Sequence, residues 1–455
     1  MANSKKATGF IARDGSESNS NKICTHQTNA RILGPLERSF YFWTLKCDDT
    51  FPYKMSLSSK YPFTVKHVSD AISYLVKQHP VLRKSFVDTG SNIELNETND
   101  QSNHLEILPK TPFYSIFNEF SLNGKLWRFI LLEPTANSTH TIEVMVAVHH
   151  ALSDYIYNRE ILRTFVNNLH LLQLGKTPST DIEFNLTMPI EDITKNVPVK
   201  DIQSYRIDRR FVNKKVSTAF EILSRSIERL NQLKCPCGSS QTIKWSLDKH
   251  ETRSFLASRS KCNGSINALI LSVCITSFMK LISGSLQQDE IVDLSFAFMV
   301  NLRRYILNQK EFRGNASIDV HLFLQLDAPV SSDKQFWLMA NEISDKIREI
   351  VDSAGLLTSA EDWIDIPREI IALTHVGSID DFLEDETTIR LEDLQVNVNA
   401  NQDLSALFHV ITHFSRGEMH FCIAYGSSFI PDQFAQALTN GINETIQHIV
   451  NVSKL

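Results

Sequence analysis

Two adjacent histidines and an aspartate follow an apolar run and are placed to carry acid–base chemistry. In residues 141–148 apolar side chains recur at every second position, which predicts a β-strand with one strongly apolar face. His149 and His150 come directly after this run, and Asp154 follows four positions after His150. Imidazole has an ordinary pKa near 6.5, so it can accept a substrate proton at neutral pH. His150 is therefore a candidate general base.

A plainer interpretation of the same residues stays open on their types and spacing alone. Ser153 or Asp154 stands where the N-cap of a following helix is expected, because an apolar helical stripe runs on to about residue 175. His150 could equally be a buried histidine whose ring nitrogens bond to the backbone.

Several short motifs resemble one acyltransferase superfamily when they are taken in chain order. The stretch His149–Asp154 resembles the HHxxxD motif of the coenzyme A–dependent acyltransferases, which include chloramphenicol acetyltransferase and peptide synthetase condensation domains. Residues 30–38 resemble the opening R-x-x-G-x-x-E block of the fungal alcohol acetyltransferase family, with Arg31, Gly34 and Glu37 at its fixed positions. Three further segments resemble the superfamily: 80–83 its HPxLR segment, 126–132 its PLWR strand, and 301–304 its vNxR strand end.

The resemblance implies a fold and an activity. It implies an α/β chain of two chloramphenicol-acetyltransferase-like lobes, with mixed sheets and a substrate channel between them. It implies acetyl-CoA as co-substrate, with no bound cofactor, no metal and no acyl-enzyme. His150 would be the base, and His149 its structural neighbour. Asp154 would organise the loop by pairing with Arg303, which follows Asn301 at the end of a buried strand; a solvated arginine is the plainer alternative there.

The acceptor of the acetyl group is left open. The expected product is an acetate ester of an alcohol. The alternatives are N-acetylation of a sphingoid-base-like amino alcohol and a degenerate acyltransferase fold used for binding. Tyr155 favours the last alternative, because the family motif continues to glycine at this position.

The elements that must position these residues follow from hydrophobic periodicity. Helices are expected at 64–79 with Thr64 as N-cap, after residue 154, and at 266–282, 333–351, 361–373 and 431–450; strands are expected at 126–132, 141–149, 243–256, 291–300, 396–399, 406–414 and 419–424. The chain is expected to divide into a disordered tail at 1–29, an N-terminal lobe with the motif at 30–175, a crossover at 176–240 and a C-terminal lobe at 241–455.

Composition narrows the functional class. The chain has 455 residues, 42% of them hydrophobic, and a formal net charge of -6, which with the absence of a basic run argues against nucleic-acid binding. The seven cysteines indicate reduced thiols, and Cys235-Pro236-Cys237 is expected to be a turn. No apolar run reaches transmembrane length. We expect a cytoplasmic monomer, with peripheral association with the endoplasmic reticulum or lipid droplets left open.

Overall fold

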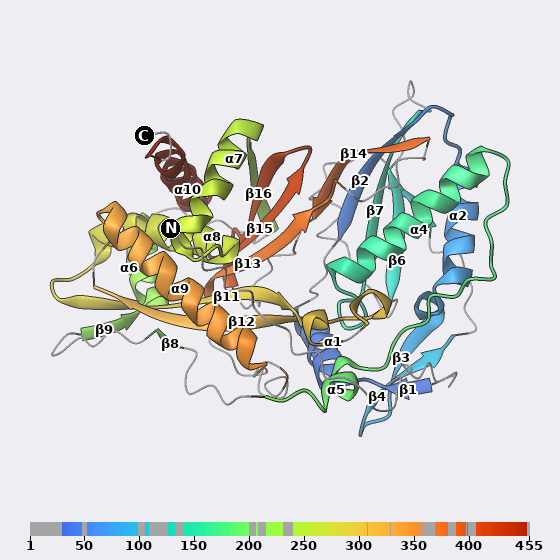
Figure 1. Ribbon diagram of the computed structural model, residues 1–455, viewed down its shortest axis with the longest axis horizontal. Coiled ribbons are helices and arrows are strands. Elements are labelled where there is room, and N and C mark those ends of the chain that lie inside the picture. The colour runs from blue at the N-terminus through green and yellow to red at the C-terminus, as the bar shows by residue number, and fades with distance from the viewer. Residues whose placement is uncertain are drawn as a thin grey trace, which may run out of the picture.

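The computed structural model has two α/β lobes that lie side by side (Figure 1). It describes residues 30–47, 52–98, 105–108, 126–132, 140–199, 206–207, 215–230, 240–306, 308–327, 329–354, 357, 369–380, 388–396, 398 and 406–452. The expected tail at 1–29 and the Cys235-Pro236-Cys237 turn lie outside these ranges. The mixed α/β, two-lobed fold class predicted from the sequence is confirmed.

The N-terminal lobe is built on a five-stranded sheet. Its strands are, in spatial order, β14 (Ile389–Val396), β2 (Tyr53–Ser59), β7 (Thr141–Val148), β6 (Trp127–Leu132) and β5 (Leu105–Leu108). Helices α2 (Val65–Gln78) and α4 (Tyr155–Gln173) lie together over this sheet (Figure 1). A small separate sheet contains β1 (Ala30–Ile32), β4 (Ile93–Glu97) and β3 (Lys84–Asp88). Helices α1 (Pro35–Cys47) and α5 (Ile190–Thr194) contact each other near it.

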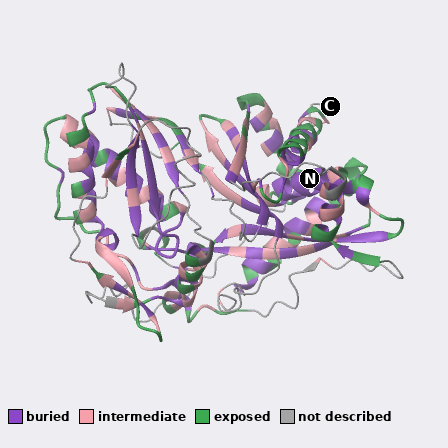
Figure 2. Ribbon diagram, turned by 180° about the vertical axis from the view of Figure 1, so that it is seen from behind, coloured by how far each residue is buried: buried purple, intermediate pink, exposed green. Residues whose placement is uncertain are grey.

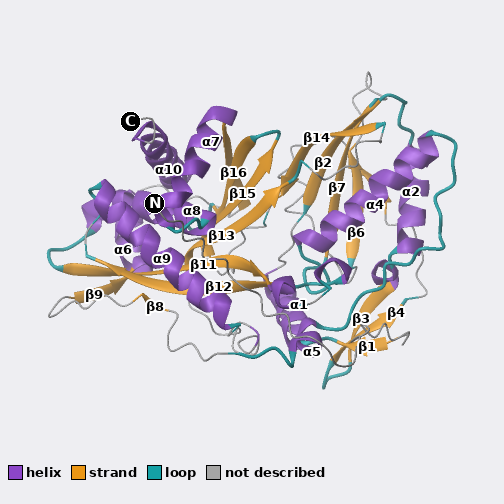
Figure 3. Cartoon of the chain, in the orientation of Figure 1, coloured by secondary structure: helices purple, strands orange, loops and turns teal. Residues whose placement is uncertain are grey.

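The C-terminal lobe is built on an eight-stranded sheet. Its strands are, in spatial order, β10 (Ser240–Leu247), β16 (Glu418–Gly426), β15 (Ala406–Ser415), β13 (Glu369–Ser378), β11 (Glu290–Asn301), β12 (Ser317–Leu326) and β8 (Arg206–Ile207), while β9 (Lys215–Thr218) pairs with β11. The helices of this lobe (Figure 3) are α6 (Ala219–Leu230), α7 (Lys249–Ser258), α8 (Ile266–Ile282), α9 (Asp333–Ser353) and α10 (Asp432–Val452).

The two faces of the large sheet bury different partners. Side chains such as Phe298 and Phe408 point into one core with helices α8 to α10. On the opposite face, Ile411 and Cys422 belong to the core of the N-terminal lobe. The large sheet is therefore covered by helices on one face and meets the other lobe on the second, which we call the inter-lobe face.

Helix α8 is the most apolar helix of the described residues. By length and composition alone, Ile266–Ser285 could cross a membrane, but 72% of its most apolar window is buried inside the protein. Figure 2 shows the buried interior of this lobe. The sequence prediction of a core helix at 266–282 is confirmed.

Most expected elements are confirmed, and three are wrong in type or extent. Thr64 caps α2 by accepting a hydrogen bond from the His67 N–H, as expected. The strand expected at 243–256 ends at Leu247, because Asp248 and Glu251 form a capping box that starts α7. Residues 369–373, expected in a helix, lie in β13, since a short apolar run does not distinguish helix from buried strand. The strand expected at 396–399 is instead β14, which ends at Val396.

Strand β14 crosses between the lobes. It pairs antiparallel with β2 and so belongs to the N-terminal sheet, although its residues fall in the range that we assigned to the C-terminal lobe. Residues 388–396 are thus an arm of the second half of the chain that completes the sheet of the first.

Candidate functional site

The turn between β7 and α4 presents the motif residues. Strand β7 lies between β2 and β6 and ends at Val148. The turn that follows is tied to β6 by the His149 N–H, which donates to the Leu126 carbonyl at 2.8 Å. Asp154 then caps α4 by accepting a hydrogen bond from the Tyr157 N–H at 3.1 Å. We call residues 149–154 the motif turn.

His150 is buried in the motif turn, in a defined tautomer. Its Nδ1 lies 2.8 Å from the Ser153 carbonyl, which can only accept, so Nδ1 carries the hydrogen and neutral His150 has its lone pair on Nε2. Its ring centroid lies 4.1 Å from that of Phe40 on α1. Burial lowers the pKa of His150 below its ordinary value, against a smaller opposing effect of Asp154. The ring is therefore neutral at neutral pH, as a general base must be.

The Nδ1 of His149 has the opposite hydrogen-bonding role to that of His150. Its Nδ1 accepts a hydrogen bond from the Ala151 N–H at 3.1 Å. The ring packs edge-on against Phe86, with centroids 4.7 Å apart. Burial lowers the pKa of His149 to about 3. These contacts fit a structural part of the turn, as the sequence suggested for this residue.

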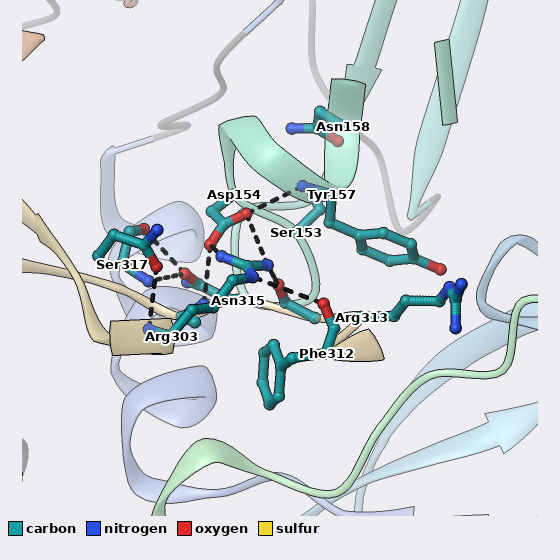
Figure 4. Close-up of polar contacts among 12 residues, drawn as sticks. Ser153, Asp154, Tyr157, Asn158, Arg303, Phe312, Arg313, Asn315 and Ser317 are labelled. Atoms are coloured by element: carbon teal, nitrogen blue, oxygen red, sulfur yellow. Dashed lines mark hydrogen bonds and ion pairs between the residues drawn. The ribbon is translucent and has the colours of Figure 1, made fainter. Parts of the chain in front are cut away.

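The structure brings Asp154 and Arg303 together in a buried bidentate ion pair (Figure 4). Arg303 Nη1 contacts Asp154 Oδ2, and Nη2 lies 3.1 Å from Oδ1. Oδ2 also accepts from the Ala316 N–H at 2.9 Å. The Asp154 carboxylate thus joins the motif turn to the ends of β11 and β12 in the other lobe, so both alternatives hold: it is a helix cap and an ion-pair partner.

Two asparagines complete the connection between the lobes. Asn301, expected from the sequence, accepts from the Arg303 N–H at 3.0 Å and so orients the arginine. Asn315, which the sequence did not single out, donates to the His150 carbonyl at 2.8 Å. Its Oδ1 accepts from the Ser317 N–H and hydroxyl, both at 2.9 Å. No local pattern marks Asn315, because its role depends on a contact 165 residues away in the chain.

The Arg31–Glu37 block acts on the motif turn indirectly, through helix α1. Both guanidinium nitrogens of Arg31 lie 2.6 Å from the Glu37 carboxylate, which also accepts from the Gly34 N–H at 3.0 Å. A Cβ at position 34 would lie 2.5 Å from the Cβ of Pro189, so only glycine fits there. The block fixes the start of α1, the helix that places Phe40 against His150.

Tyr155 occupies the first position of α4 with an ordinary backbone. It is not among the described non-glycine residues with positive φ, so the backbone here does not require glycine. Its ring packs on the N-terminal core, with its centroid 6.3 Å from that of Tyr53.

Metal binding finds no support in the part of the chain that the structure describes. No group of three or more His, Cys, Asp or Glu side chains there is arranged to hold a metal ion.

Comparison with known proteins identifies the fold. No protein-family model matches the chain, and no curated protein sequence does so either. Among solved structures, the trichothecene 15-O-acetyltransferase TRI3 from Fusarium sporotrichioides matches with a TM-score of 0.67 at 12% identity, over 92% of this chain and 95% of that chain. Polyketide synthase associated protein 5 from Mycobacterium tuberculosis gives 0.64 at 13% identity, over 90% and 97%. The condensation domain of the monacolin K polyketide synthase gives 0.59 at 9% identity, over 94% and 98%.

These structural similarities establish the fold. The activity is argued from the residues of the site. The chain has the two-lobed fold of CoA-dependent acyltransferases and condensation domains.

Proposed function

We propose that the protein is an acetyl-CoA–dependent acyltransferase that makes acetate esters from alcohols, as in the fungal alcohol acetyltransferase family. The observation that carries the proposal is His150: a buried, neutral imidazole whose Nδ1–H is held by the Ser153 carbonyl, which leaves Nε2 as the base. It stands in the motif turn of a fold that it shares with a 15-O-acetyltransferase.

The proposed reaction is a direct transfer without an acyl-enzyme. His150 Nε2 takes the proton of the acceptor hydroxyl as its oxygen attacks the thioester carbonyl. The tetrahedral intermediate then collapses with cleavage of the C–S bond, and the imidazolium returns the proton to the CoA thiolate. Such a base contributes about 10²–10⁴-fold to the rate.

Asp154 takes no part in the proton transfer in this proposal. Both of its oxygens are occupied by Arg303 and by backbone N–H groups, so the carboxylate holds the turn in place. Loss of this pair would move His150 relative to both substrates, and a well-oriented site can supply about 7–11 kcal/mol of rate enhancement.

Domain boundaries and location are parts of the same proposal. We assign residues 30–175 and 241–455 to the two lobes, with 176–240 as crossover and β14 as an exchanged arm. We propose a monomer in the cytoplasm, in keeping with the buried cysteines Cys262 and Cys274, which form no disulfide.

The test is thiol release from acetyl-CoA by purified protein, with alcohols and amines as acceptors and products identified by mass spectrometry. We expect acceptor-dependent release that forms esters and falls at least 100-fold in the His150→Gln variant. His149→Gln is the matched control, and it should retain the rate within about threefold if it folds. Release on no acceptor by folded protein would overturn the proposal in favour of a binding module, and amide products would overturn the choice of an alcohol.

A further inference from the structure

Four residues in register form a row across the inter-lobe face of the large sheet. His409 of β15 pairs with Ala372 of β13, Ala372 with Ala297 of β11, and Ala297 with His321 of β12. Side chains of residues directly opposite each other on neighbouring strands point to the same face. The row, which we call the inter-lobe row, thus has two small side chains in its middle and a histidine at each end.

Three residues of this row are buried, and His321 at its end is half-buried. Ile411, two residues after His409 on the same strand face, packs in the core of the N-terminal lobe. Ala297 and Ala372 form a small cluster with Ala406, apart from the main cores of both lobes. The row therefore lies on the face where the lobes meet, and its central alanines belong to neither main core.

Two carboxylates stand at the His321 end of the row. The Nδ1 of His321 donates to Glu369 Oε1 in a short contact. Asp319 lies two residues before His321 and on the same face of β12. Burial, with the nearby Glu369, raises the pKa of Asp319 to about 6. Burial alone would lower the pKa of His321, but the hydrogen bond to Glu369 and the charges of both carboxylates together raise it. When Asp319, Glu369 and His321 are all charged, the cluster carries a net charge of −1.

Two buried polar atoms in this region lack a partner. Glu369 is 1% exposed and its Oε2 makes no hydrogen bond, while His409 is 8% exposed and its Nε2 makes none. A buried carboxylate oxygen without a donor is rare in folded proteins and calls for an external donor. The described residues around it do not form a metal-binding group. A protonated amine of a ligand would supply such a donor and a positive charge beside the two carboxylates.

Strand β12 connects the row to the backbone of His150. Ser317 is bonded to Asn315, the residue that holds the His150 carbonyl. From Ser317, β12 runs through Asp319 to His321 on one face, and four residues of strand span about 13 Å. A ligand lying along this strand from the carboxylates toward Ser317 would approach the motif turn.

We propose that the inter-lobe row, with Asp319 and Glu369 beside it, binds the protonated amine of an amino-alcohol acceptor whose hydroxyl reacts at His150. This proposal rests on the acetyltransferase function proposed above and names its substrate class. The amine keeps its proton in the acidic site, so it is not a nucleophile and the product is the O-acetyl ester. The C–O bond forms at the hydroxyl and the thioester C–S bond breaks, with His150 carrying the proton between them.

The experiment uses a series of linear amino alcohols of increasing chain length, each matched with the alkanol that lacks the amine. Calorimetric binding is measured without acetyl-CoA, and thiol release is measured with it. Glu369→Gln and Asp319→Asn keep the side-chain shapes, and Glu418→Gln removes a carboxylate from the neighbouring β16 as control. We expect amino alcohols to bind about tenfold to hundredfold more weakly to the first two variants, with alkanol binding and Glu418→Gln unchanged.

The two readouts separate this proposal from the function on which it rests. Equal binding of amino alcohols and alkanols, or amine binding that survives both substitutions, overturns the amine site even if alkanols are acetylated. Row-dependent amine binding with no acetyl transfer to any acceptor supports the site and overturns the acetyltransferase function. N-acetylated products overturn the orientation of the acceptor. Melting temperatures of the variants check that they are folded.

Discussion

The motif turn and the region of the inter-lobe row each hold a buried carboxylate, Asp154 and Glu369, and they differ in how its oxygens are bonded. In the motif turn, both oxygens of Asp154 are bonded within the protein, and His150 is held by Ser153 through Nδ1 and by Asn315 through its carbonyl. In the region of the row, Glu369 Oε2 and His409 Nε2 have no hydrogen-bond partner.

This difference distinguishes the motif turn, which holds a residue in place, from the row, which we propose binds a ligand. A carboxylate with both oxygens bonded fixes the geometry of the turn around it, which suits a base that must stand in one place. Buried polar atoms without a partner are a cost to the free protein that a ligand can remove on binding. A buried carboxylate thus serves a different purpose in each region, and substitutions should affect the two regions differently: stability and rate in the turn, acceptor choice in the row.

The largest expected effect on stability is at Arg303. Arg303→Met leaves the buried Asp154 carboxylate without its counter-charge, so we expect the free energy of unfolding to fall by about 3–5 kcal/mol. Urea unfolding followed by circular dichroism measures this.

The double variant Asp154→Asn/Arg303→Met is the control for the Arg303 substitution. It removes both charges and keeps a side chain that can cap α4, so its loss should be smaller than that of the single variant. If Arg303→Met costs less than about 1 kcal/mol, the pair behaves like a solvated surface pair and the description of the turn as a closed network is wrong.

A smaller effect is expected at Asn315. Asn315→Ala leaves the His150 carbonyl and the Ser317 N–H without their bonds, at a cost of about 1–3 kcal/mol. Since the substitution loosens the backbone of His150 and touches no substrate in our proposal, kcat should fall about tenfold while KM stays nearly constant. Steady-state kinetics on the best acceptor measures both constants.

Asn308→Ala provides the matched control for Asn315, because Asn308 is exposed and bonded only weakly to Glu311 at 3.4 Å. A drop in kcat as large as that of Asn315→Ala would show that the loop before β12 acts as a whole and not through the His150 carbonyl.

A fall in pH should reduce the free energy of unfolding through a buried histidine in each of the two regions. Burial lowers the pKa of His149 in the turn to about 3 and that of His409 in the row to about 4. As the pH falls below 6.5, the unfolded chain takes up protons that the folded protein does not, so folding loses about 1.4 kcal/mol per pH unit for each histidine. The loss extends from about pH 6.5 down to the folded pKa of each group and is absent above pH 6.5.

Urea midpoints between pH 7.5 and 5 measure that slope. His149→Gln and His409→Gln should each reduce it by a similar amount, since each removes one desolvated imidazole. An unchanged slope in either variant would mean that this histidine is protonated in the folded protein. For His409 that result would also bear on the row, because a charged imidazole there would oppose binding of a cation.

The sequence predicted the motif turn well because the signals there are local. The alternation in β7 and the helical stripe of α4 place His150 and Asp154, and the resemblance supplied Arg303 as a partner. The register of the large sheet is not local: Ala372 and His409 face each other only because β13 and β15 lie parallel with connections outside both strands. The row was therefore invisible in sequence, as was the pairing of β14 with β2. The run in 369–373 was misassigned for the related reason that a fully buried strand lacks alternation.

The smallest effect should come from Tyr155, at the exit of the motif turn. Tyr155→Ala removes a half-buried ring and keeps a good helix former, whereas Tyr155→Gly adds a helix cost of about 1 kcal/mol. Because the backbone at this position is ordinary and the ring packs toward the N-terminal core, both variants should retain kcat/KM within about threefold. A more than tenfold gain on long acceptors, equal in both variants, would show that the ring restricts the substrate path. A gain in Tyr155→Gly alone would instead mean that the turn needs backbone freedom, and the picture of a rigid turn beside an adaptable recognition row would have to be reversed.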